Sequence, residues 1–353
     1  MDAVITVLPG DGIGPEVAEA GARILQEIAG RFGHRFEIRE QLIGGAAIDA
    51  VGDPLPNTTV AACLESNAVV LGAVGGPKWS DPNATIRPEQ GLLGLRSKLG
   101  VFANLRPVKI FDALSAASPL KAERLYDVDL VVVRELTGGI YFGAKTRNDR
   151  SASDLCIYEV EEIERIVRTA AAIAQKRRNK LCSVDKANVL ETSRLWRSVT
   201  NRVMADEFPD VRLEHMLVDS AAMHLINRPS EFDVIVTENM FGDILTDEAS
   251  MLAGSMGMLP SASLGKTRLG LYEPIHGSAP DIAGKGIANP CGMLASIAML
   301  LEYSLELTEE ARTIEQAIEA VIAGGARTAD IAIDGEPALS THEMTDAIIQ
   351  QLR

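Results

Sequence analysis

The sequence is short of cysteine, of long apolar runs and of positive charge. Its cysteines are widely separated and form no C-x-x-C pair; they are Cys63, Cys156, Cys182 and Cys291. This spacing fits neither a zinc site nor a disulfide framework and predicts reduced thiols. The longest apolar stretch, CGMLASIAMLL, is too short to span a bilayer. The formal net charge of -15 argues against nucleic acid or an anionic membrane surface as the main partner.

The sequence also lacks an internal repeat, a low-complexity tract and a visible secretory signal, because Asp2 leads directly into an apolar run. We therefore expect a soluble cytoplasmic protein. A chain of 353 residues can bury a substantial core and is predicted to divide into two domains. Its hydrophobic fraction of 46% and charged fraction of 24% are ordinary for a globular protein.

A complete dinucleotide fingerprint is missing from the first turn. The stretch VITVLPGDGIGPEV carries G-x-G-x-G at Gly10, Gly12 and Gly14, whereas the Rossmann motif is G-x-G-x-x-G. Pro15 opens a helix well but has no N–H group to donate to a phosphate. The stretch is therefore predicted to be a tight turn between a strand and a helix that lines some cleft, with a Rossmann phosphate loop as the alternative.

Strand-like and helix-like segments alternate through the first three quarters of the chain. The runs AVITVL, RFEIRE, AVVLGAV, DLVVVREL, KLCSVDK, VRLEHMLVD and FDVIVTE are typical of strands. The stretch 159–178 is typical of an amphipathic helix, with one apolar stripe formed by Ile163, Ile166, Val167, Ala170 and Ile173. This alternation predicts an α/β protein with a largely parallel sheet. The last hundred residues are predicted to be mostly helical.

The segment 138–159 breaks this pattern. GGIYFGAK and ASDLCIYEV are two short strand candidates on either side of a polar turn, and neither has helical periodicity. They predict a hairpin arm that pairs within its own domain or with another subunit.

The stretch PEQGLLGLRSKLGVFANLRP combines an acid, branched apolar groups and bases. On a helix, Glu89, Leu93 and Arg96 share one part of the surface, and Leu92 lies beside them. The alternative is that Leu92, Leu95 and Leu99 form an ordinary core stripe. Arg106 lies in a strand-like run and Arg134 ends another. Three arginines beside strand ends favour a dicarboxylate site, since guanidinium groups match carboxylate oxygens in pairs.

The stretch ENMFGDILTDEAS places Asp243 and Asp247 four residues apart on one helix face, where like charges repel. A hard divalent cation would neutralise them, and Asp219, which follows another strand, could complete its ligands. The alternative is two exposed acids near a helix N-terminus. Lys186, just past a strand, and Tyr141, in the arm, need tuned pKa values to exchange protons at neutral pH.

The stretch EPIHGSAPDIAGKGIANP is rich in small residues but carries His276 and Asp281. Small residues let a ligand approach the backbone, and an acid can accept hydrogen bonds from ribose hydroxyls. A long surface loop is the alternative, although long loops in compact domains are often functional.

Together these segments resemble the β-decarboxylating dehydrogenases, the family of isocitrate and 3-isopropylmalate dehydrogenases. The resemblance covers the whole chain and is densest in GLLGLR, FANLRP, RELTGGIYFG, VDKANVLE, FGDILTDEAS and HGSAPDIAGKGIANP. It implies a two-domain α/β fold with a mixed, largely parallel sheet flanked by helices, which is not a classical Rossmann domain. It implies a cofactor-binding domain of residues 1–101 plus 255–353 and a substrate and dimerisation domain of residues 102–254, with the arm at about 138–159.

The resemblance also implies a role for each candidate residue. Arg96, Arg106 and Arg134 are similar to the clamp on the malate carboxylates, and Leu92 and Leu93 to the pair that receives the isopropyl group. Asp219, Asp243 and Asp247 resemble Mg²⁺ or Mn²⁺ ligands, with Asp219 also on the substrate. Tyr141 and Lys186 resemble the catalytic pair. The implied NAD site comprises Ile13, Gly76, Glu89, His276, Gly277, Ser278, Ala279, Pro280, Asp281, Ile282 and Asn289.

The implied activity is NAD-dependent oxidative decarboxylation of 3-isopropylmalate in leucine biosynthesis. The implied assembly is a homodimer in which Lys186 and Asp219 reach into the partner's site. Two alternatives remain: an NAD enzyme for D-malate, tartrate or homoisocitrate, and a non-catalytic regulatory subunit.

Overall fold

A computed structural model of the chain describes residues 1–81, 83–333 and 335–352. The chain forms two compact units. Unit 1 comprises Met1–Val101, Phe111–Ser118 and Ala253–Arg353, and unit 2 comprises Phe102–Ile110 and Pro119–Leu252. Segment 111–118 thus belongs with unit 1, whereas the sequence-based boundaries put it in the second domain. None of the described helices is long and apolar enough to cross a membrane.

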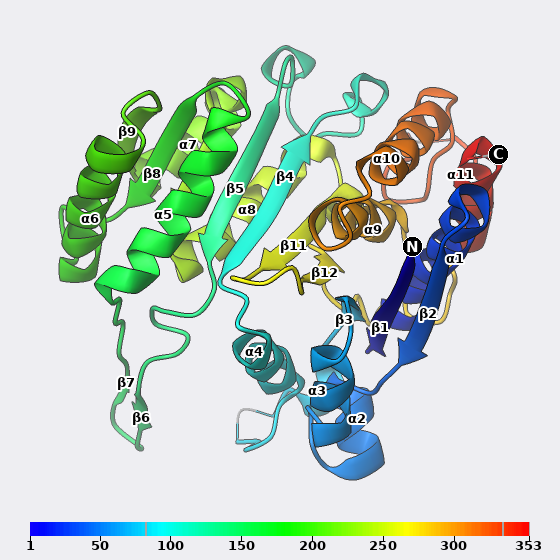
Figure 1. Ribbon diagram of the computed structural model, residues 1–353, viewed down its shortest axis with the longest axis horizontal. Helices are drawn as coiled ribbons and strands as arrows, with labels where there is room; N and C mark the ends of the chain where they lie inside the picture. The colour runs from blue at the N-terminus through cyan, green and yellow to red at the C-terminus, as the bar shows by residue number, and fades with distance from the viewer. Residues whose placement is uncertain (82, 334, 353) are drawn as a thin grey trace. The chain divides into compact units, whose positions relative to one another are not determined.

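Unit 1 is a mixed sheet with helices on both faces (Figure 1). Its strand order is β2-β1-β3-β12-β11, in which β11 runs antiparallel to β12 and the other pairs are parallel. The strands are β1 (Asp2–Gly10), β2 (Arg35–Glu40), β3 (Ala68–Ala73), β11 (Pro260–Leu264) and β12 (Leu271–Pro274). The helices are α1 (Gly14–Phe32), α2 (Gly44–Val51), α3 (Asn57–Leu64), α4 (Pro88–Leu99), α9 (Cys291–Tyr303), α10 (Thr308–Ala323) and α11 (Thr341–Leu352).

Every residue of β3 is buried, as expected for a strand covered on both faces. One face carries Val69 and Leu71, which join Leu8, Leu95 and Leu99 in an apolar cluster that places α4 against the sheet. Helices α1 and α9 pack against β3 as well, and α1 also packs against β1. The strand order and the antiparallel β11 differ from a Rossmann domain.

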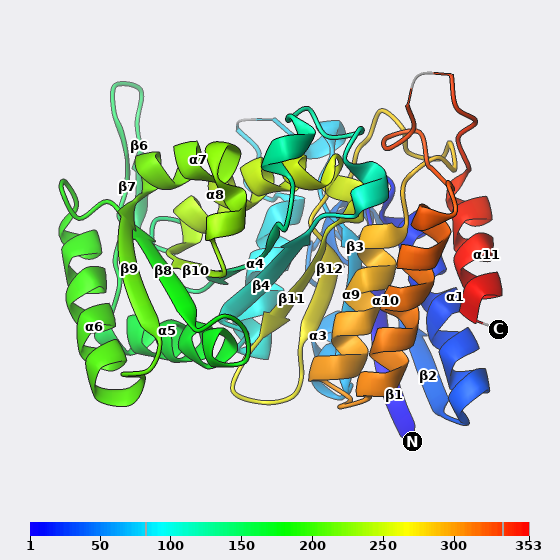
Figure 2. The same ribbon diagram turned by 90° about the horizontal axis from the view of Figure 1, so that it is seen from above.

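Unit 2 is also a mixed, mostly parallel sheet between helices. Its order is β4-β5-β10-β8-β9, in which β4 runs antiparallel to β5 and the other pairs are parallel. Figure 2 shows α5 and α6 on one side of these strands and α7 and α8 on the other. The strands are β4 (Ala103–Lys109), β5 (Asp129–Glu135), β8 (Lys180–Asp185), β9 (Arg212–Leu217) and β10 (Val234–Thr237). The helices are α5 (Val160–Gln175), α6 (Glu191–Glu207), α7 (Val218–Asn227) and α8 (Asn239–Ser250).

The predicted arm is a hairpin that projects from unit 2 (Figure 1), but its strands are shorter than expected. β6 (Lys145–Arg147) pairs antiparallel with β7 (Ala152–Asp154). The expected strand 138–145 is wrong over most of its length. The amides of Thr137 and Gly138 bond to the Glu135 carboxylate, and Gly139 has a φ of +78°, so the chain turns there instead.

Candidate active site

Two buried arginines of unit 2 lie against one face of α8. Arg106 comes from β4 and Arg134 from the end of β5, and their side chains are 8% and 4% exposed. Both strands pack against α8, which begins two residues after β10. Residues 239, 243 and 246 of α8 share a helix face, since they are three or four positions apart. The sheet and one helix therefore bring together two cations that are far apart in the sequence.

Each arginine is held by a neutral side chain as well as by an acid. Arg106 donates from Nε to Asn104 Oδ1 at 2.7 Å and from Nη1 to Thr246 Oγ1 at 2.6 Å. Arg134 donates to Asn239 Oδ1 from Nε at 3.1 Å and from Nη2 at 2.8 Å, and its Nη1 pairs with Asp243. The guanidinium orientations are thus set before any ligand arrives.

The two aspartates of α8 face these arginines and remain partly exposed. Asp243 lies 3.8 Å and Asp247 3.6 Å from the guanidinium nitrogens of Arg106. Burial raises the pKa of Asp247, while the charge of Arg106 opposes this rise. The predicted helix and the shared face of the two acids are as expected from their spacing. The arginines offset the repulsion that the spacing creates.

Tyr141 joins the same cluster. Its hydroxyl donates to Asp243 Oδ2 at 3.0 Å, and its ring lies 5.9 Å from the Arg134 guanidinium. Burial, together with the charge of Asp243 and the hydrogen bond to it, raises the pKa of Tyr141 to about 12. The phenol is therefore protonated at neutral pH and can act as a proton donor.

Lys186 and Asp219 form a pair of their own in unit 2. Lys186 Nζ donates to Asp219 Oδ1 at 2.6 Å, and this bond lowers the pKa of the Asp219 carboxyl. Among the described residues of one chain, no three His, Cys, Asp or Glu side chains come together as a metal site. Asp219 therefore does not join Asp243 and Asp247 within a single chain.

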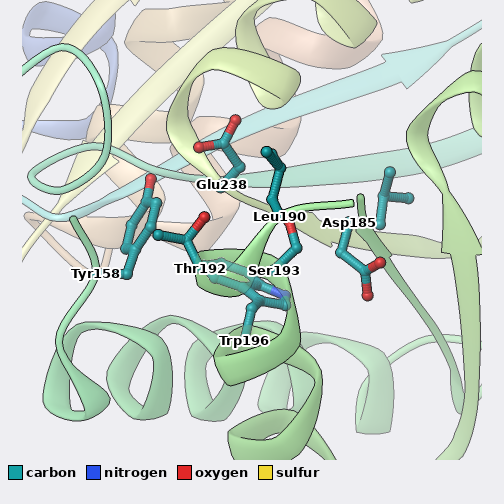
Figure 3. A pocket seen from close by; sticks show the side chains of 8 residues that line it. Tyr158, Asp185, Leu190, Thr192, Ser193, Trp196 and Glu238 are labelled. Carbon is teal, nitrogen blue, oxygen red and sulfur yellow. The ribbon is translucent and has the colours of Figure 1, made fainter. Parts of the chain in front are cut away.

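Residues of α6 fix the backbone at Lys186. Its amide donates to Ser193 Oγ at 3.0 Å, and the preceding Asp185 forms a two-bond pair with Arg197, both bonds being 2.8 Å. A small cavity of about 10 Å³ lies beside this loop (Figure 3). It is lined by Tyr158, Val184, Asp185, Leu190, Thr192, Ser193, Trp196 and Glu238. Such a space holds one water at most, so it is not a substrate pocket.

In unit 1, α4 has the predicted helical form and presents the expected residues. Leu92 packs against the apolar cluster on the sheet, which supports the core interpretation for that residue, and Leu93 lies half-buried beside it. Arg96 is buried and donates from Nη2 to Glu273 Oε1 of β12 at 2.7 Å. Its Nε is buried without a hydrogen-bond partner in the described part of the chain.

The early glycine turn and the late loop 276–289 meet within unit 1. Ile13 donates its amide to the Ser278 carbonyl at 2.8 Å. Gly12 has a φ of +60°, and a Cβ there would lie 2.0 Å from that carbonyl oxygen, so only glycine fits. Asp11 accepts the Gly75 amide at 2.8 Å, and Glu89 Oε1 lies where a side chain on Gly75 would point. Thus Ile13, Gly76, Glu89 and the late loop share one region of unit 1.

The late loop has two features typical of a ligand site. His276 Nδ1 donates to the Gly277 carbonyl at 2.9 Å, which makes Nε2 an acceptor, yet Nε2 is buried and has no partner in the described residues. Burial also lowers the pKa of His276, so the ring is neutral. Ala279 has a φ of +37°, a left-handed conformation that non-glycine residues adopt rarely.

Residues 4–348 match the family model described as isocitrate/isopropylmalate dehydrogenase. The chain belongs to this family. It is 58% identical to a 3-isopropylmalate dehydrogenase of Rhodopirellula baltica, over 100% of this chain and 99% of that one. It is 57% identical to one of Bacillus subtilis, over 99% and 96%.

Solved structures are similar too. The isocitrate dehydrogenase of Methylococcus capsulatus matches with a TM-score of 0.88 at 34% identity, covering 99% of both chains. A β-decarboxylating dehydrogenase of Thermococcus kodakarensis matches with a TM-score of 0.78 at 35% identity, covering 99% and 96%. The family and the fold class inferred from the motifs are confirmed.

Several residues of the site gave no signal in the sequence. Asn104, Asn239, Thr246 and Glu273 hold the arginines in the structure, but none of them was expected. Of these, Asn239 and Thr246 lie within the stretch that was singled out for its aspartates. They share the helix face of Asp243, but this spacing does not single them out, because the sequence does not show which strands pack against α8.

Proposed function

We propose that this protein catalyses the NAD-dependent oxidative decarboxylation of (2R,3S)-3-isopropylmalate to 4-methyl-2-oxopentanoate and CO₂, a reaction of leucine biosynthesis. One observation carries the proposal. Relatives that match nearly the whole chain at 58% and 57% identity are named 3-isopropylmalate dehydrogenases. Leu92 and Leu93 support this substrate, because a branched alkyl group gains free energy from apolar contact.

The substrate is a dianion, and the proposed carboxylate ligands are Arg96, Arg106 and Arg134. Arg106 and Arg134 support this assignment, since both side chains are buried and are oriented by neutral partners. Tyr141 lies beside Arg134 in the same cluster. Arginine matches carboxylates with two parallel hydrogen bonds.

Asp243 and Asp247 fit part of a divalent cation site. Their carboxylates are one helical turn apart, and oxygen donors of this type are what Mg²⁺ and Mn²⁺ prefer. Two acids from one chain do not complete such a site, so we assign the third ligand to the partner subunit's Asp219. When bound, the cation supplies a Lewis acid that polarises the C2 oxygen of the substrate.

The late loop of unit 1 fits NAD. The unpartnered His276 Nε2 offers a buried acceptor, and the small residues 277–279 let a nucleotide approach the backbone. The exposed Asp281 offers a carboxylate to ribose hydroxyls and would repel a 2′-phosphate, which favours NAD over NADP. We assign Ile13, Gly76, Glu89 and loop residues 276–282 and 289 to this site. When bound there, NAD would supply the hydride acceptor for the oxidation.

Proton movements are assigned to Lys186 and Tyr141. The partner subunit's Lys186 takes the proton of the C2 hydroxyl as the hydride leaves. This requires that its side chain first be released from the pair with Asp219 and lose its own proton, so that a neutral amine faces the substrate. Loss of CO₂ from the resulting β-keto carboxylate leaves an enolate. Tyr141, which is protonated and oriented by Asp243, then donates a proton to C3.

A homodimer follows from this division of residues. Large apolar side chains are exposed on α7 and α8, among them Met223 at 62%, Ile226 at 47% and Ile244 at 58%. The arm also exposes Leu155 and Ile157. Exposed apolar groups concentrated on neighbouring elements mark a protein interface. We assign this surface to contact with a second copy of the chain. Unit 2 is then the substrate-binding and dimerisation domain, and unit 1 is the cofactor-binding domain. We assign the enzyme to the cytoplasm.

The substrate assignment is tested by steady-state kinetics of the purified protein with NAD and Mg²⁺ or Mn²⁺. The kcat/KM for 3-isopropylmalate should exceed those for D-malate and homoisocitrate by about 10-fold or more, because neither of these compounds carries the isopropyl group. NAD should be used in preference to NADP. A higher kcat/KM for D-malate or homoisocitrate would refute the proposed substrate, and no turnover with any of them would favour a regulatory subunit.

A further inference from the structure

Asn239 binds the guanidinium group of Arg134 with two hydrogen bonds. Its Oδ1 accepts from both Nε and Nη2 of Arg134, so one edge of the guanidinium is bound by a single amide. As whole residues, Asn239 is 1% exposed and Arg134 is 3% exposed. A buried, two-point contact of this kind fixes the rotation of the guanidinium plane.

The orientation of the Asn239 amide is itself determined by its surroundings. Nδ2 donates to the Gly138 carbonyl at 3.2 Å, and only the nitrogen can do so. The oxygen must therefore face Arg134. The backbone amide of Asn239 donates to Tyr158 Oη at 2.9 Å, so Asn239 contacts the arm at both of its ends, at Gly138 and at Tyr158.

The aliphatic part of the Arg134 side chain lies against Gly242. A Cβ at Gly242 would lie 2.6 Å from Cγ and 2.8 Å from Cβ of Arg134, closer than side chains can pack. The absence of a side chain at this helical position makes room for the aliphatic part of Arg134. One turn of α8 thus receives the whole arginine, with Gly242 at its stem and Asn239 at its head.

We propose that Asn239 is a positioning residue that aims the charge of Arg134 at the substrate while leaving that charge available. This inference rests on the proposed function, in which Arg134 binds a substrate carboxylate. Asp243 already supplies one negative charge to Arg134. A second carboxylate at position 239 would bind the same edge bidentately and compete with the ligand for the cation. The neutral amide orients the guanidinium without that competition.

The test is isothermal titration of the full-length protein with 3-isopropylmalate in the presence of Mg²⁺, comparing wild type, Asn239→Asp and Asn239→Ser. The Kd should rise about 10- to 100-fold in Asn239→Asp, corresponding to loss of a charge-assisted contact, and less in Asn239→Ser. The Kd for NAD should not change. D-malate serves as a second probe of the carboxylate contacts, since it lacks the isopropyl group.

A matched control is Asn57→Asp, which makes the same charge change at an exposed position at the start of α3. It should leave the Kd for 3-isopropylmalate unchanged. A purely structural role of Asn239 would lower the fraction of protein that binds while leaving Kd constant, and that result would overturn the proposal. So would failure of both Asn239 variants to fold, or absence of binding to wild type.

Turnover by the wild-type protein distinguishes a failure of the proposed function from a failure of the positioning role of Asn239. If wild type binds 3-isopropylmalate without turning it over, the proposed function fails, and the Kd ratios still decide the role of Asn239. If wild type is active and Asn239→Asp binds with the wild-type Kd, the positioning role alone is contradicted.

Discussion

Leu92 and Leu93 are neighbours on α4, but they have different surroundings. Leu92 packs against the apolar cluster that joins α4 to β1, β3 and β12. Among the described residues, that cluster does not include Leu93. The sequence pattern placed both leucines in one candidate pocket and also allowed a core role for one of them. The structure separates the two interpretations, because Leu92 contributes to the core whatever its part in substrate binding.

Truncation of the two leucines should therefore have different effects. Leu93→Ala should lower the preference for 3-isopropylmalate over D-malate about 10-fold or more, with little effect on stability. Leu92→Ala should also cost about 1–3 kcal/mol of unfolding free energy, because it leaves a cavity beside the core. Chemical denaturation and the kcat/KM ratio measure these effects. An unchanged ratio in Leu93→Ala would contradict its assignment to the alkyl group.

Most charged residues of the site could be found from the sequence, whereas the residues that hold the arginines in place could not. Asp243 and Asp247 attract notice because like charges at a spacing of four need an explanation. Asn239 and Thr246 are unremarkable on a helix, and their role depends on which strands pack against α8. Glu273 is similar, since its partner Arg96 lies 177 positions away. Long-range pairing of this kind is a property of the tertiary structure.

Among the elements, the strands of the strand-like runs were predictable, whereas β11 and β12 were not. β3, β5 and β10 are mostly runs of buried apolar residues, and each lies where the sequence predicts it, as do the more polar β2, β8 and β9. β11 and β12 were missed, and the prediction of a mostly helical end is wrong for residues 260–274. β11 consists of PSASL, in which proline and two serines suggest a loop. Its burial comes from neighbours in the sheet, which the local pattern does not reveal.

Asp11 connects three elements of unit 1 and provides a test at this scale. It is 5% exposed and accepts the amides of Gly45 and Ala46 at the start of α2 and of Gly75 after β3. Asp11→Asn replaces one acceptor oxygen with a donor, which cannot satisfy these amides. We expect a loss of about 1–3 kcal/mol in unfolding free energy.

Asp11→Asn should also raise the KM for NAD more than that for 3-isopropylmalate, because Asp11 holds the turn that contacts Ser278. Asp2→Asn, an exposed acid on β1, is the matched control and should change neither quantity. Wild-type stability in Asp11→Asn would show that the three hydrogen bonds do not hold these loops together.

At the scale of the whole molecule, the proposed active site needs two copies of the chain. A single chain brings Arg106, Arg134, Tyr141, Asp243 and Asp247 together, while Lys186 and Asp219 pair elsewhere in unit 2. The described part of one chain contains no complete cation site. The exposed apolar residues of α7, α8 and the arm offer a surface on which a second copy could supply the missing groups.

The most direct measurement is the activity of mixed dimers. Tyr141→Phe and Lys186→Ala chains, each inactive or nearly so alone, are unfolded together, refolded at equal amounts and assayed with 3-isopropylmalate, NAD and Mg²⁺. If each site combines Tyr141 of one chain with the partner subunit's Lys186, half of the dimers carry one intact site, and about a quarter of the wild-type activity returns. If the wild type recovers its activity after the same treatment and the mixture stays inactive, each chain uses its own lysine, and the shared site is contradicted.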